Sequence, residues 1–347
     1  MKRQRYIAYV GTYTNGDSKG IQVYELDTSR QGFIKLSETP VNNPSALTVA
    51  HNGKYLYSIA DEGVAAFRIM PDGLLEHINT APTGGMRGCA LCMDANDRYV
   101  FVGGYHDGRV SMLRVNKDGS IGDITDGIFH KGLGVSITEK NFQPHVTDVC
   151  MTPDDKYLCA VDQGLDQVVI YEVDYEHGKI KKHDIIRLQI DAAPRKMVFG
   201  KDGIHAYVLC ESKVAINIYK YNTDMDEAEL QDSVSTIYQD PDRCAPYGLD
   251  ITEDGKYLFV SNAGTNTAAI FKVKKDGDIS EICQSKISGE FPKVIKVLPD
   301  SDYFVTLNHE QDEIVTFKMN YAKGYFLQKG RPVKVEKPNC IYIHRLQ

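Results

Sequence analysis

One short motif recurs along this chain at intervals of about 50 residues. Each copy reads as an apolar strand, a tight turn rich in Asp, Asn and Gly, and a second strand that usually opens on an aromatic residue. A period of this length with only strand and hairpin signals is typical of a β-propeller, in which each repeat forms one blade. The six turn dipeptides are Asn52-Gly53, Asn96-Asp97, Asp154-Asp155, Asp202-Gly203, Asp254-Gly255 and Asp300-Ser301.

The two ends of the chain together supply a seventh copy. Residues Tyr6–Tyr13 match the second strand of the repeat, and Gly20–Leu26 and Gly32–Leu36 read as a third and a fourth strand. The missing inner strand is Pro338–Ile343, which matches Pro44–Val49 near the start of the first full copy. Pairing of the ends would close the ring without an exposed strand edge. We predict an all-β fold: a seven-bladed β-propeller, with the seventh blade closed by N- and C-terminal strands, forming a single domain over residues 1–347.

Charge and hydropathy exclude several partners. The net charge is −7, and the basic residues are scattered among acidic ones, which argues against a nucleic-acid surface. No apolar run approaches the roughly 20 residues of a membrane helix, and no signal-type core follows the first five residues. We therefore expect a cytoplasmic protein without nucleic-acid or membrane partners. No motif has the spacing of a metal site or a phosphate-binding loop, so we expect neither a metal nor a cofactor.

The chain has eight cysteines, most of them within predicted strands. The pair Cys89 and Cys92 has the spacing of a metal or redox motif. On a strand, however, side chains three residues apart leave opposite faces. We favour core packing for the cysteines, with a reactive or metal-binding role as the alternative.

The repeat also defines a register from which positions can be compared between blades. The start of the inner strand and the end of the second strand share one end of a blade because the two strands are antiparallel. The first position, seven residues before each turn, holds Ser45, Cys89, Thr147, Arg195, Tyr247 and Lys293, with Asn339 from the split blade. The second position, nine residues after the first turn residue, holds Asp61, Tyr105, Gln163, Glu211, Ala263 and His309, with Thr12 from the split blade.

These two sets of positions differ chemically from the rest of the repeat. Two residues further along the inner strands lies an apolar layer, whereas the two sets carry charged, aromatic and hydroxyl groups that differ from blade to blade. The apolar residues are Leu47, Leu91, Val149, Met197, Leu249, Ile295 and Ile341. Neighbouring positions add Asp148, Lys196 and His106. Polar variety around one end of a channel favours an asymmetric ligand. A purely structural alternative stays open: Arg195 and Glu211 can form an ion pair within one blade, and Asp61 can cap a loop.

Several segments of the chain resemble a known family. They are Tyr9–Thr14 with Ser18–Ile21, Asn43–Leu47, Gln143–His145, Ala193–Phe199, Tyr207–Glu211 and Asp254–Asn262. Together they are similar to the bacterial lactonase family of seven-bladed propellers, whose best-known members are 6-phosphogluconolactonases. Fungal carboxy-muconate cycloisomerases belong to the same superfamily. The resemblance covers essentially the whole chain and implies the same propeller fold.

The resemblance also assigns site residues. Arg195 and Glu211 match residues of the family's presumed active site. Four positions depart from its pattern: Thr147 and Lys196 stand where histidine is usual, and Ala263 and Lys293 where arginine is usual. A histidine is retained two residues before Thr147, as His145. His145 also borders a long insertion together with His130, where a structural or rim position is the simpler interpretation.

The resemblance implies hydrolysis of a sugar lactone, with 6-phosphogluconolactone converted to 6-phosphogluconate as the leading reaction. Hydrolysis needs a positioned water, a proton acceptor and donors for the oxyanion. The acceptor stays open between Glu211, His309 and His106, while Arg195 would hold the oxyanion or a substrate anion. The candidate catalytic residues are Glu211, Arg195 and His309, and the candidate substrate-binding residues are Lys293, Lys196, Thr147, His145, Tyr247, Asp61, Tyr105 and His106.

Two other functions stay open at this point. One is an isomerase or cycloisomerase, or a lactonase acting on another sugar acid, which the departures at Thr147 and Ala263 favour. The other is a propeller that binds such a ligand without catalysis. In each case the expected partner is a small sugar lactone or sugar acid, with or without a phosphate group.

Overall fold

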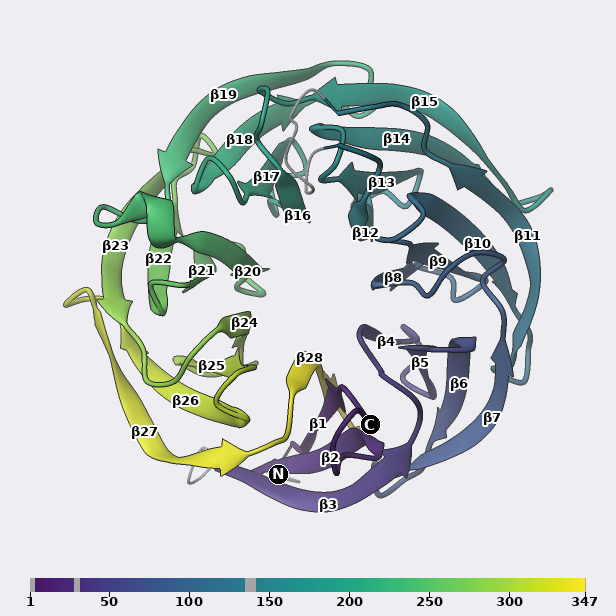
Figure 1. Cartoon of the computed structure of the whole chain (residues 1–347), viewed down its shortest axis with the longest axis horizontal. Helices are drawn as coiled ribbons and strands as arrows, with labels where there is room; N and C mark the ends of the chain where they lie inside the picture. Colours follow the sequence, from purple (N-terminus) through teal and green to yellow (C-terminus); the bar gives the residue numbers. More distant parts are fainter. Residues whose placement is uncertain (1–3, 28–31, 135–141, 347) are drawn as a thin grey trace.

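The repeats form a ring of seven four-stranded antiparallel sheets around a central channel (Figure 1). This computed structural model describes residues 4–27, 32–134 and 142–346. The predicted seven-bladed propeller is confirmed. No helix in the described ranges is both long and apolar enough to cross a membrane, and one short 3-10 helix spans Pro241–Arg243.

In every blade the strand beside the channel pairs with a second strand that is almost wholly buried. Burial on both faces explains why the second strands are rich in Val, Ile, Leu and aromatic residues. The inner strands are β4 (Leu47–Val49), β8 (Ala90–Met93), β12 (Val146–Met151), β16 (Pro194–Phe199), β20 (Ala245–Ile251), β24 (Pro292–Val297) and β28 (Pro338–Arg345). The second strands are β5 (Tyr55–Ala60), β9 (Tyr99–Gly103), β13 (Tyr157–Asp162), β17 (His205–Cys210), β21 (Tyr257–Ala263), β25 (Tyr303–Asn308) and β1 (Tyr6–Thr12).

The outer half of each blade consists of a third, largely buried strand and a fourth strand at the rim (Figure 1). The third strands are β6 (Gly63–Ile69), β10 (Arg109–Val115), β14 (Gln167–Asp174), β18 (Ala215–Tyr221), β22 (Thr267–Val273), β26 (Glu313–Asn320) and β2 (Gly20–Asp27). The fourth strands are β7 (Leu75–Ala81), β11 (Ile121–Phe129), β15 (Lys179–Arg187), β19 (Ala228–Ser235), β23 (Ile279–Lys286), β27 (Tyr325–Lys334) and β3 (Gly32–Pro40).

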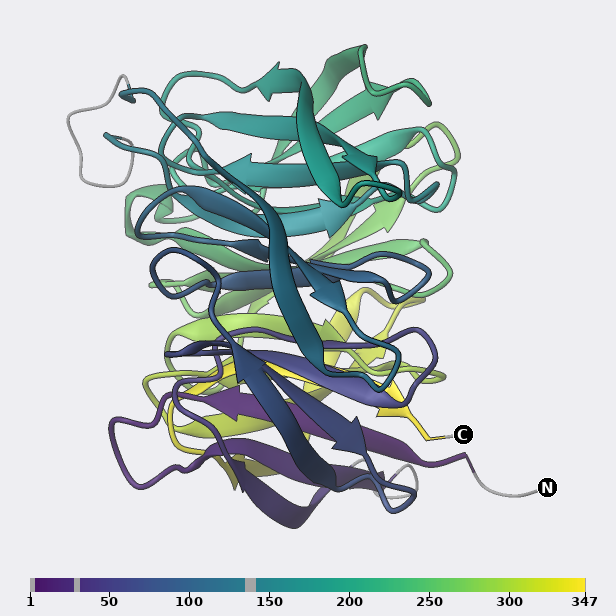
Figure 2. The same cartoon turned by 90° about the vertical axis from the view of Figure 1, so that its right-hand side faces the viewer.

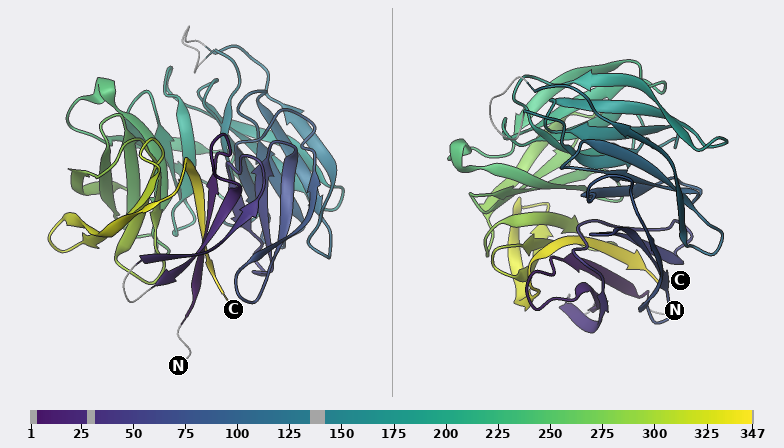
Figure 3. Two further views of the ribbon diagram at one scale, coloured as in Figure 1. Left: turned by 60° about the horizontal axis from the view of Figure 1, so that its bottom comes forward. Right: turned by 45° about the vertical axis from the view of Figure 1, so that its right-hand side comes forward.

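The chain ends meet in one blade, as predicted. Its strand order is β28-β1-β2-β3, and the pairing of β28 with β1 runs from Tyr6 opposite Arg345 to Thr12 opposite Pro338. The Leu346 N–H also donates to the Arg5 carbonyl at 3.0 Å. Figures 2 and 3 show both termini leaving from the same face of the ring.

The turn dipeptides of the repeat connect the inner strands to the second strands. One residue of each dipeptide occupies the left-handed region, with φ of 71° at Gly53 and 57° at Asp97. Only Gly, Asn and Asp adopt this conformation at low cost, which explains the turn composition. The Tyr6 hydroxyl hydrogen-bonds to the carboxylate of Asp300, so these turns lie on the face from which the termini emerge.

Tyrosines of the second strands tie neighbouring blades together. The hydroxyl of Tyr57 donates to the Gly119 carbonyl at 3.0 Å, and that of Tyr207 to the Gly277 carbonyl at 2.8 Å. Each ring is buried between two sheets while its hydroxyl reaches an outer turn of the adjacent blade. Buried tyrosines need such a partner, and Tyr9 of the split blade makes the same contact with the Gly73 carbonyl at 2.9 Å.

Candidate active site

Five of the inner strands begin with a β-bulge. In each, one extra residue lies between two ladder positions: Thr147, Arg195, Tyr247, Lys293 or Asn339. These are five of the seven residues that the register placed at the start of the inner strands. A bulge leaves its extra residue outside the ladder and redirects its side chain. The predicted set is therefore aimed by a repeated backbone irregularity that the sequence analysis did not anticipate.

The second predicted set lies at the same end of the blades. The Glu211 N–H donates to the Ala193 carbonyl at 2.9 Å, and the His309 N–H donates to the Phe291 carbonyl at 3.0 Å. In the split blade this bond is made by the Tyr13 N–H, to the Lys337 carbonyl at 3.1 Å. The choice of Thr12 was therefore wrong by one residue. Thr12 is buried, and its hydroxyl donates to the Gly20 carbonyl at 2.7 Å.

The two sets surround a cavity of about 560 Å³ at the channel mouth opposite the termini. Eight of the predicted site residues line it, whereas Asp61, His145 and His309 do not. Tyr13, Asp148 and Gln163 also line the cavity. The sequence analysis did not place Tyr13 in either set and gave no role to Asp148 or Gln163. The predicted residues that line the cavity are Glu211, Arg195, Lys293, Lys196, Thr147, Tyr247, Tyr105 and His106.

Arg195 and Glu211 form an ion pair inside the cavity. The Arg195 guanidinium donates to Glu211 Oε2 at 2.6 Å, and Gln163 Nε2 donates to the same oxygen at 2.9 Å. The guanidinium also lies 3.2 Å from the centroid of the Tyr247 ring. The pair is well shielded, with the two side chains 16% and 5% exposed. The ion pair within one blade that was considered as a structural alternative is therefore present, and both of its residues line the cavity.

Lys293 is a buried cation held between aromatic rings. Its ammonium lies 4.8 Å from the Tyr13 ring centroid and 5.9 Å from that of Tyr247, and it donates to the Tyr13 hydroxyl at 3.4 Å. Burial, together with the nearby charge of Arg195, lowers the pKa of Lys293 to about 8. No ion pair joins Lys293 to a carboxylate within the described residues. A shielded ammonium of this kind suits an anionic ligand.

Four basic residues, Arg195, Lys293, Lys196 and Arg87, line the cavity and are called the cation cluster below. Asp61 lies at its outer edge. Its carboxylate accepts a hydrogen bond from Arg87 at 2.9 Å and another from the Asn43 side chain at 2.7 Å. Arg87 lines the cavity and lies 5.7 Å from the Tyr13 ring centroid. Asp61 therefore orients Arg87 from outside the cavity.

The three histidines among the predicted residues take different positions. His106 lines the cavity, edge-on to Tyr105. His145 is stacked behind Tyr105 with ring centroids 4.2 Å apart, and its Nδ1 donates to the Tyr105 carbonyl at 2.6 Å. His309 packs edge-on against Tyr13, and its Nδ1 donates to the Pro338 carbonyl at 3.0 Å. Burial lowers the pKa of His309, so its ring is neutral near pH 7.

The eight cysteine thiols are free, and the two with the metal-like spacing, Cys89 and Cys92, are poorly ionised. Burial raises the pKa of Cys89, which lines the cavity, to about 12, and raises that of Cys92 well above its usual value. A protonated thiol is a poor nucleophile and metal ligand, which disfavours the reactive alternative. In the part of the chain that the structure describes, no three His, Cys, Asp or Glu residues are grouped closely enough to hold a metal ion.

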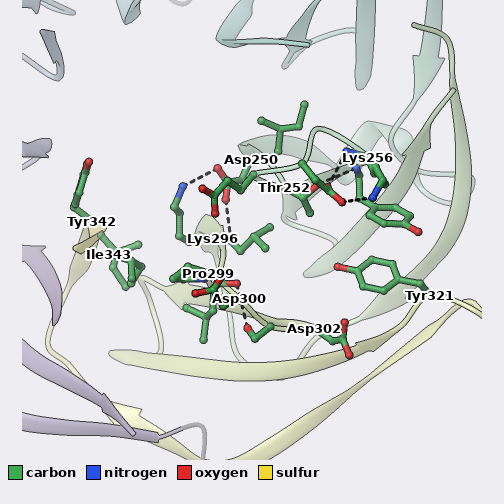
Figure 4. A pocket seen from close by; sticks show the side chains of 18 residues that line it. Asp250, Thr252, Lys256, Lys296, Pro299, Asp300, Asp302, Tyr321, Tyr342 and Ile343 are labelled. Atoms are coloured by element: carbon green, nitrogen blue, oxygen red, sulfur yellow. Dashed lines mark hydrogen bonds and ion pairs between the residues drawn. The ribbon is translucent and has the colours of Figure 1, made fainter. Parts of the chain in front are cut away.

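A second cavity of about 830 Å³ opens at the other end of the channel (Figure 4). It lies beside the turns that follow β20 and β24, and none of the predicted site residues lines it. Lys296 and Ile341 line both cavities. The Lys296 ammonium donates to Asp250 at 2.8 Å, so a charged pair stands between the two cavities.

A closed propeller with a cation-rich cavity at one channel mouth places this chain among propellers whose site suits small anionic or polar ligands. Within this class, the chain belongs to the lactonase family of seven-bladed β-propellers, whose profile matches residues 7–343. The 6-phosphogluconolactonase of Bacillus subtilis is 29% identical over 352 residues, covering 99% of each chain.

Solved structures agree on the fold. A Bacteroides fragilis protein, provisionally named a 6-phosphogluconolactonase, has a TM-score of 0.90 at 26% identity and covers 98% of both chains. The periplasmic gluconolactonase of Pseudomonas aeruginosa has a TM-score of 0.91 at 23% identity, covering 99% of this chain and 100% of its own. The second similarity shows the shared fold alone.

Proposed function

We propose that this protein hydrolyses a sugar lactone, with 6-phosphogluconolactone as the leading substrate. The observation that carries the proposal is the cavity, where the Arg195–Glu211 pair lies beside Lys293, Lys196 and Arg87. The names of the B. subtilis relative and the B. fragilis protein support the same reaction. The proposed setting is the cytoplasm, where the product 6-phosphogluconate would enter the pentose phosphate route.

The cation cluster suits a substrate with an anionic group at one end. Arg195 is already neutralised by Glu211, and Arg87 is engaged by Asp61. Lys293 has no such partner among the described residues and offers an uncompensated charge, in a wall formed by Tyr13 and Tyr247. A phosphate at this position would gain charge-assisted hydrogen bonds in a partly desolvated site. Hydroxyl groups of the sugar could then be bound by Thr147, Tyr105 and His106.

The Arg195 side suits the carbonyl chemistry. Attack of water on a lactone carbonyl places negative charge on the carbonyl oxygen. Arg195 is fixed by Glu211 on one side and by the Tyr247 ring on the other, so it needs no reorganisation as this charge develops. We assign Arg195 to the oxyanion, with Glu211 and Gln163 holding it in position. His309 and His145 support Tyr13 and Tyr105 from outside the cavity.

The direct test follows the decay of enzymatically generated 6-phosphogluconolactone, corrected for its spontaneous opening. We expect acceleration by the pure protein, and weaker acceleration with unphosphorylated gluconolactone. Absence of acceleration with any lactone would overturn the proposal. A panel that includes keto-sugar acids and muconolactones would then detect isomerase activity, and a thermal shift without turnover would indicate a binding module.

Lys293→Met is expected to raise KM for the phosphorylated lactone about 10-fold to 100-fold, with a smaller change in kcat. The reason is that a buried ammonium facing the phosphate contributes mainly to binding. Steady-state kinetics with phosphorylated and unphosphorylated lactones measure the effect, which should be small for the latter. Lys256→Met is the matched control, because Lys256 pairs with Asp254 at the far end of the channel. Equal losses on both substrates would contradict phosphate recognition by Lys293.

The affinity for anionic substrates should fall as the pH rises through about 8. Lys293 is protonated below this pKa and neutral above it, so the attraction to the anion is present at lower pH and lost at higher pH. KM measured against pH should rise on the alkaline side in the wild type. Lys293→Arg should flatten that rise, because a guanidinium stays charged. An unchanged alkaline rise in Lys293→Arg would assign it to another group.

A further inference from the structure

Asp148 is a carboxylate in the cavity wall that the proposed function has not used. It lies on β12 directly after the bulge at Thr147 and lines the 560 Å³ cavity. Its Oδ2 accepts the Met197 N–H of the next blade at 3.1 Å. Among the described residues no basic side chain forms an ion pair with it. Its contacts are therefore with backbone N–H groups, of Met197 and of Val149, while the carboxylate lines the cavity without a basic side chain paired to it among the described residues.

A second inner-strand aspartate provides a comparison within the same molecule. Asp250 on β20 also accepts a backbone N–H of the next blade, from Val297 at 2.8 Å. Its other oxygen accepts the Lys296 ammonium at 2.8 Å, so both oxygens are engaged. Asp250 thus links two blades and balances a buried charge. Asp148 has the backbone contact to the next blade, but among the described residues it has no ion pair like that of Asp250 with Lys296.

We propose that Asp148 is the general base and acid of the lactonase reaction, an inference that rests on the proposed function. As water oxygen bonds to the lactone carbonyl carbon, Asp148 takes one of its protons, and the carbonyl oxygen becomes an oxyanion facing Arg195. Collapse of this intermediate breaks the ring C–O bond, and Asp148 returns the proton to the departing ring oxygen. The products are the open hydroxy acid, which loses a proton to solvent, and the regenerated carboxylate.

The surroundings of Asp148 suit this role better than those of Glu211. Glu211 Oε2 is held by both Arg195 and Gln163, which stabilises the ionised form and weakens it as a base. Burial raises the pKa of Asp148 to about 6, against opposing contributions from Lys196 and Arg195 on β16. An efficient general base has a pKa near the working pH.

The remaining titratable groups near Asp148 are the thiols Cys89 and Cys92 on the β8 side and Cys150 on its own strand. Burial raises the pKa of Cys89 to about 12 and that of Cys92 well above its usual value, and a hydrogen bond with Cys159 together with burial does the same for Cys150. All three are therefore uncharged near neutral pH and do not titrate together with Asp148.

The test is Asp148→Asn, which keeps an oxygen for the Met197 N–H and removes the proton acceptor. We expect kcat to fall about 10²-fold to 10⁴-fold with KM changed by less than about threefold. The acidic limb of the wild-type kcat/KM profile, near pH 6, should disappear. Asp250→Asn, the matched loss of a buried carboxylate, should keep that limb, and so should Glu211→Gln despite its lower activity.

Thermal unfolding provides a readout independent of turnover. Because the folded state raises the pKa of Asp148 from 3.8 to about 6, its ionisation costs stability in full above pH 6, and this cost falls away as the pH drops from 6 to 3.8. Asp148→Asn should therefore raise the Tm more at about pH 8 than at about pH 5. An active Asp148→Asn enzyme with its acidic limb intact, or loss of that limb in Glu211→Gln, would overturn the assignment alone. A wild type inactive on every lactone would overturn both the assignment and the proposed function.

Discussion

Arg195→Met lowers kcat/KM for 6-phosphogluconolactone by about 10²-fold to 10³-fold, which is the expected loss when one fixed oxyanion donor is removed. The effect should fall mainly on kcat, because the charge that Arg195 stabilises develops only in the transition state. The structure gives the reason for a large effect: the guanidinium is clamped between Glu211 and the Tyr247 ring and is only 16% exposed. Lactone hydrolysis under saturating and limiting substrate separates the two parameters.

Two comparisons make this result specific. Arg68→Met removes an exposed arginine that pairs with Glu76 on the outer strands, and it should leave the kinetics unchanged. In a double-mutant cycle, Glu211→Gln should cost little more once Arg195 is already Met, since the main role assigned to Glu211 is to hold Arg195. Retention of kcat within about threefold in Arg195→Met would remove Arg195 from the oxyanion role.

A chain that ends at Lys337 should lose cooperative folding. Without β28, the split blade exposes the edge of β1, and the apolar contacts of Ile341 and Ile343 with the core of this blade are lost. The net stability of a globular protein is only about 5–15 kcal/mol. We expect the loss of a whole inner strand with its buried side chains to consume most of such a margin. Urea unfolding followed by circular dichroism should show a broad transition at low denaturant in place of a single steep one.

A circular permutant provides the control for chain cutting. Leu346 and Arg5 lie within one hydrogen bond of each other, so a short linker can join the natural ends. New ends in the exposed β26–β27 turn, between Ala322 and Lys323, retain all the strands while moving the break. This permutant should unfold cooperatively. If the truncated chain unfolded as steeply as the full chain, closure by β28 would not be what holds the ring together.

The fold could be predicted because each repeat states the same pattern again. The turns at Asn52-Gly53 and its equivalents fix the register of two strands at once, and the missing inner strand of the split blade has a recognisable copy at Pro338. Where the turn is absent, the register loses its reference. The second strand of the split blade follows no inner-strand turn, so it was aligned by its aromatic residues and slipped by one, which exchanged Tyr13 for Thr12.

Side-chain direction could be predicted less well than backbone position. The register placed His309 correctly at the end of a second strand, but packing against Tyr13 and the bond to Pro338 direct it away from the cavity. His145 is turned behind Tyr105 in the same way. Asp148 was seen only as a neighbour of the register positions. Its difference from Asp250 depends on which oxygens find partners, and that is settled by contacts between blades.

The five bulges at the inner-strand starts have a consequence for how propellers of this family diversify. Residues Thr147, Arg195, Tyr247, Lys293 and Asn339 stand outside the ladder, so exchanging their side chains leaves the strand pairing of each blade unchanged. The residues that would select the ligand can therefore change without altering the strand pairing that the fold requires. A lineage can test new substrates one blade at a time while the ring retains its stability.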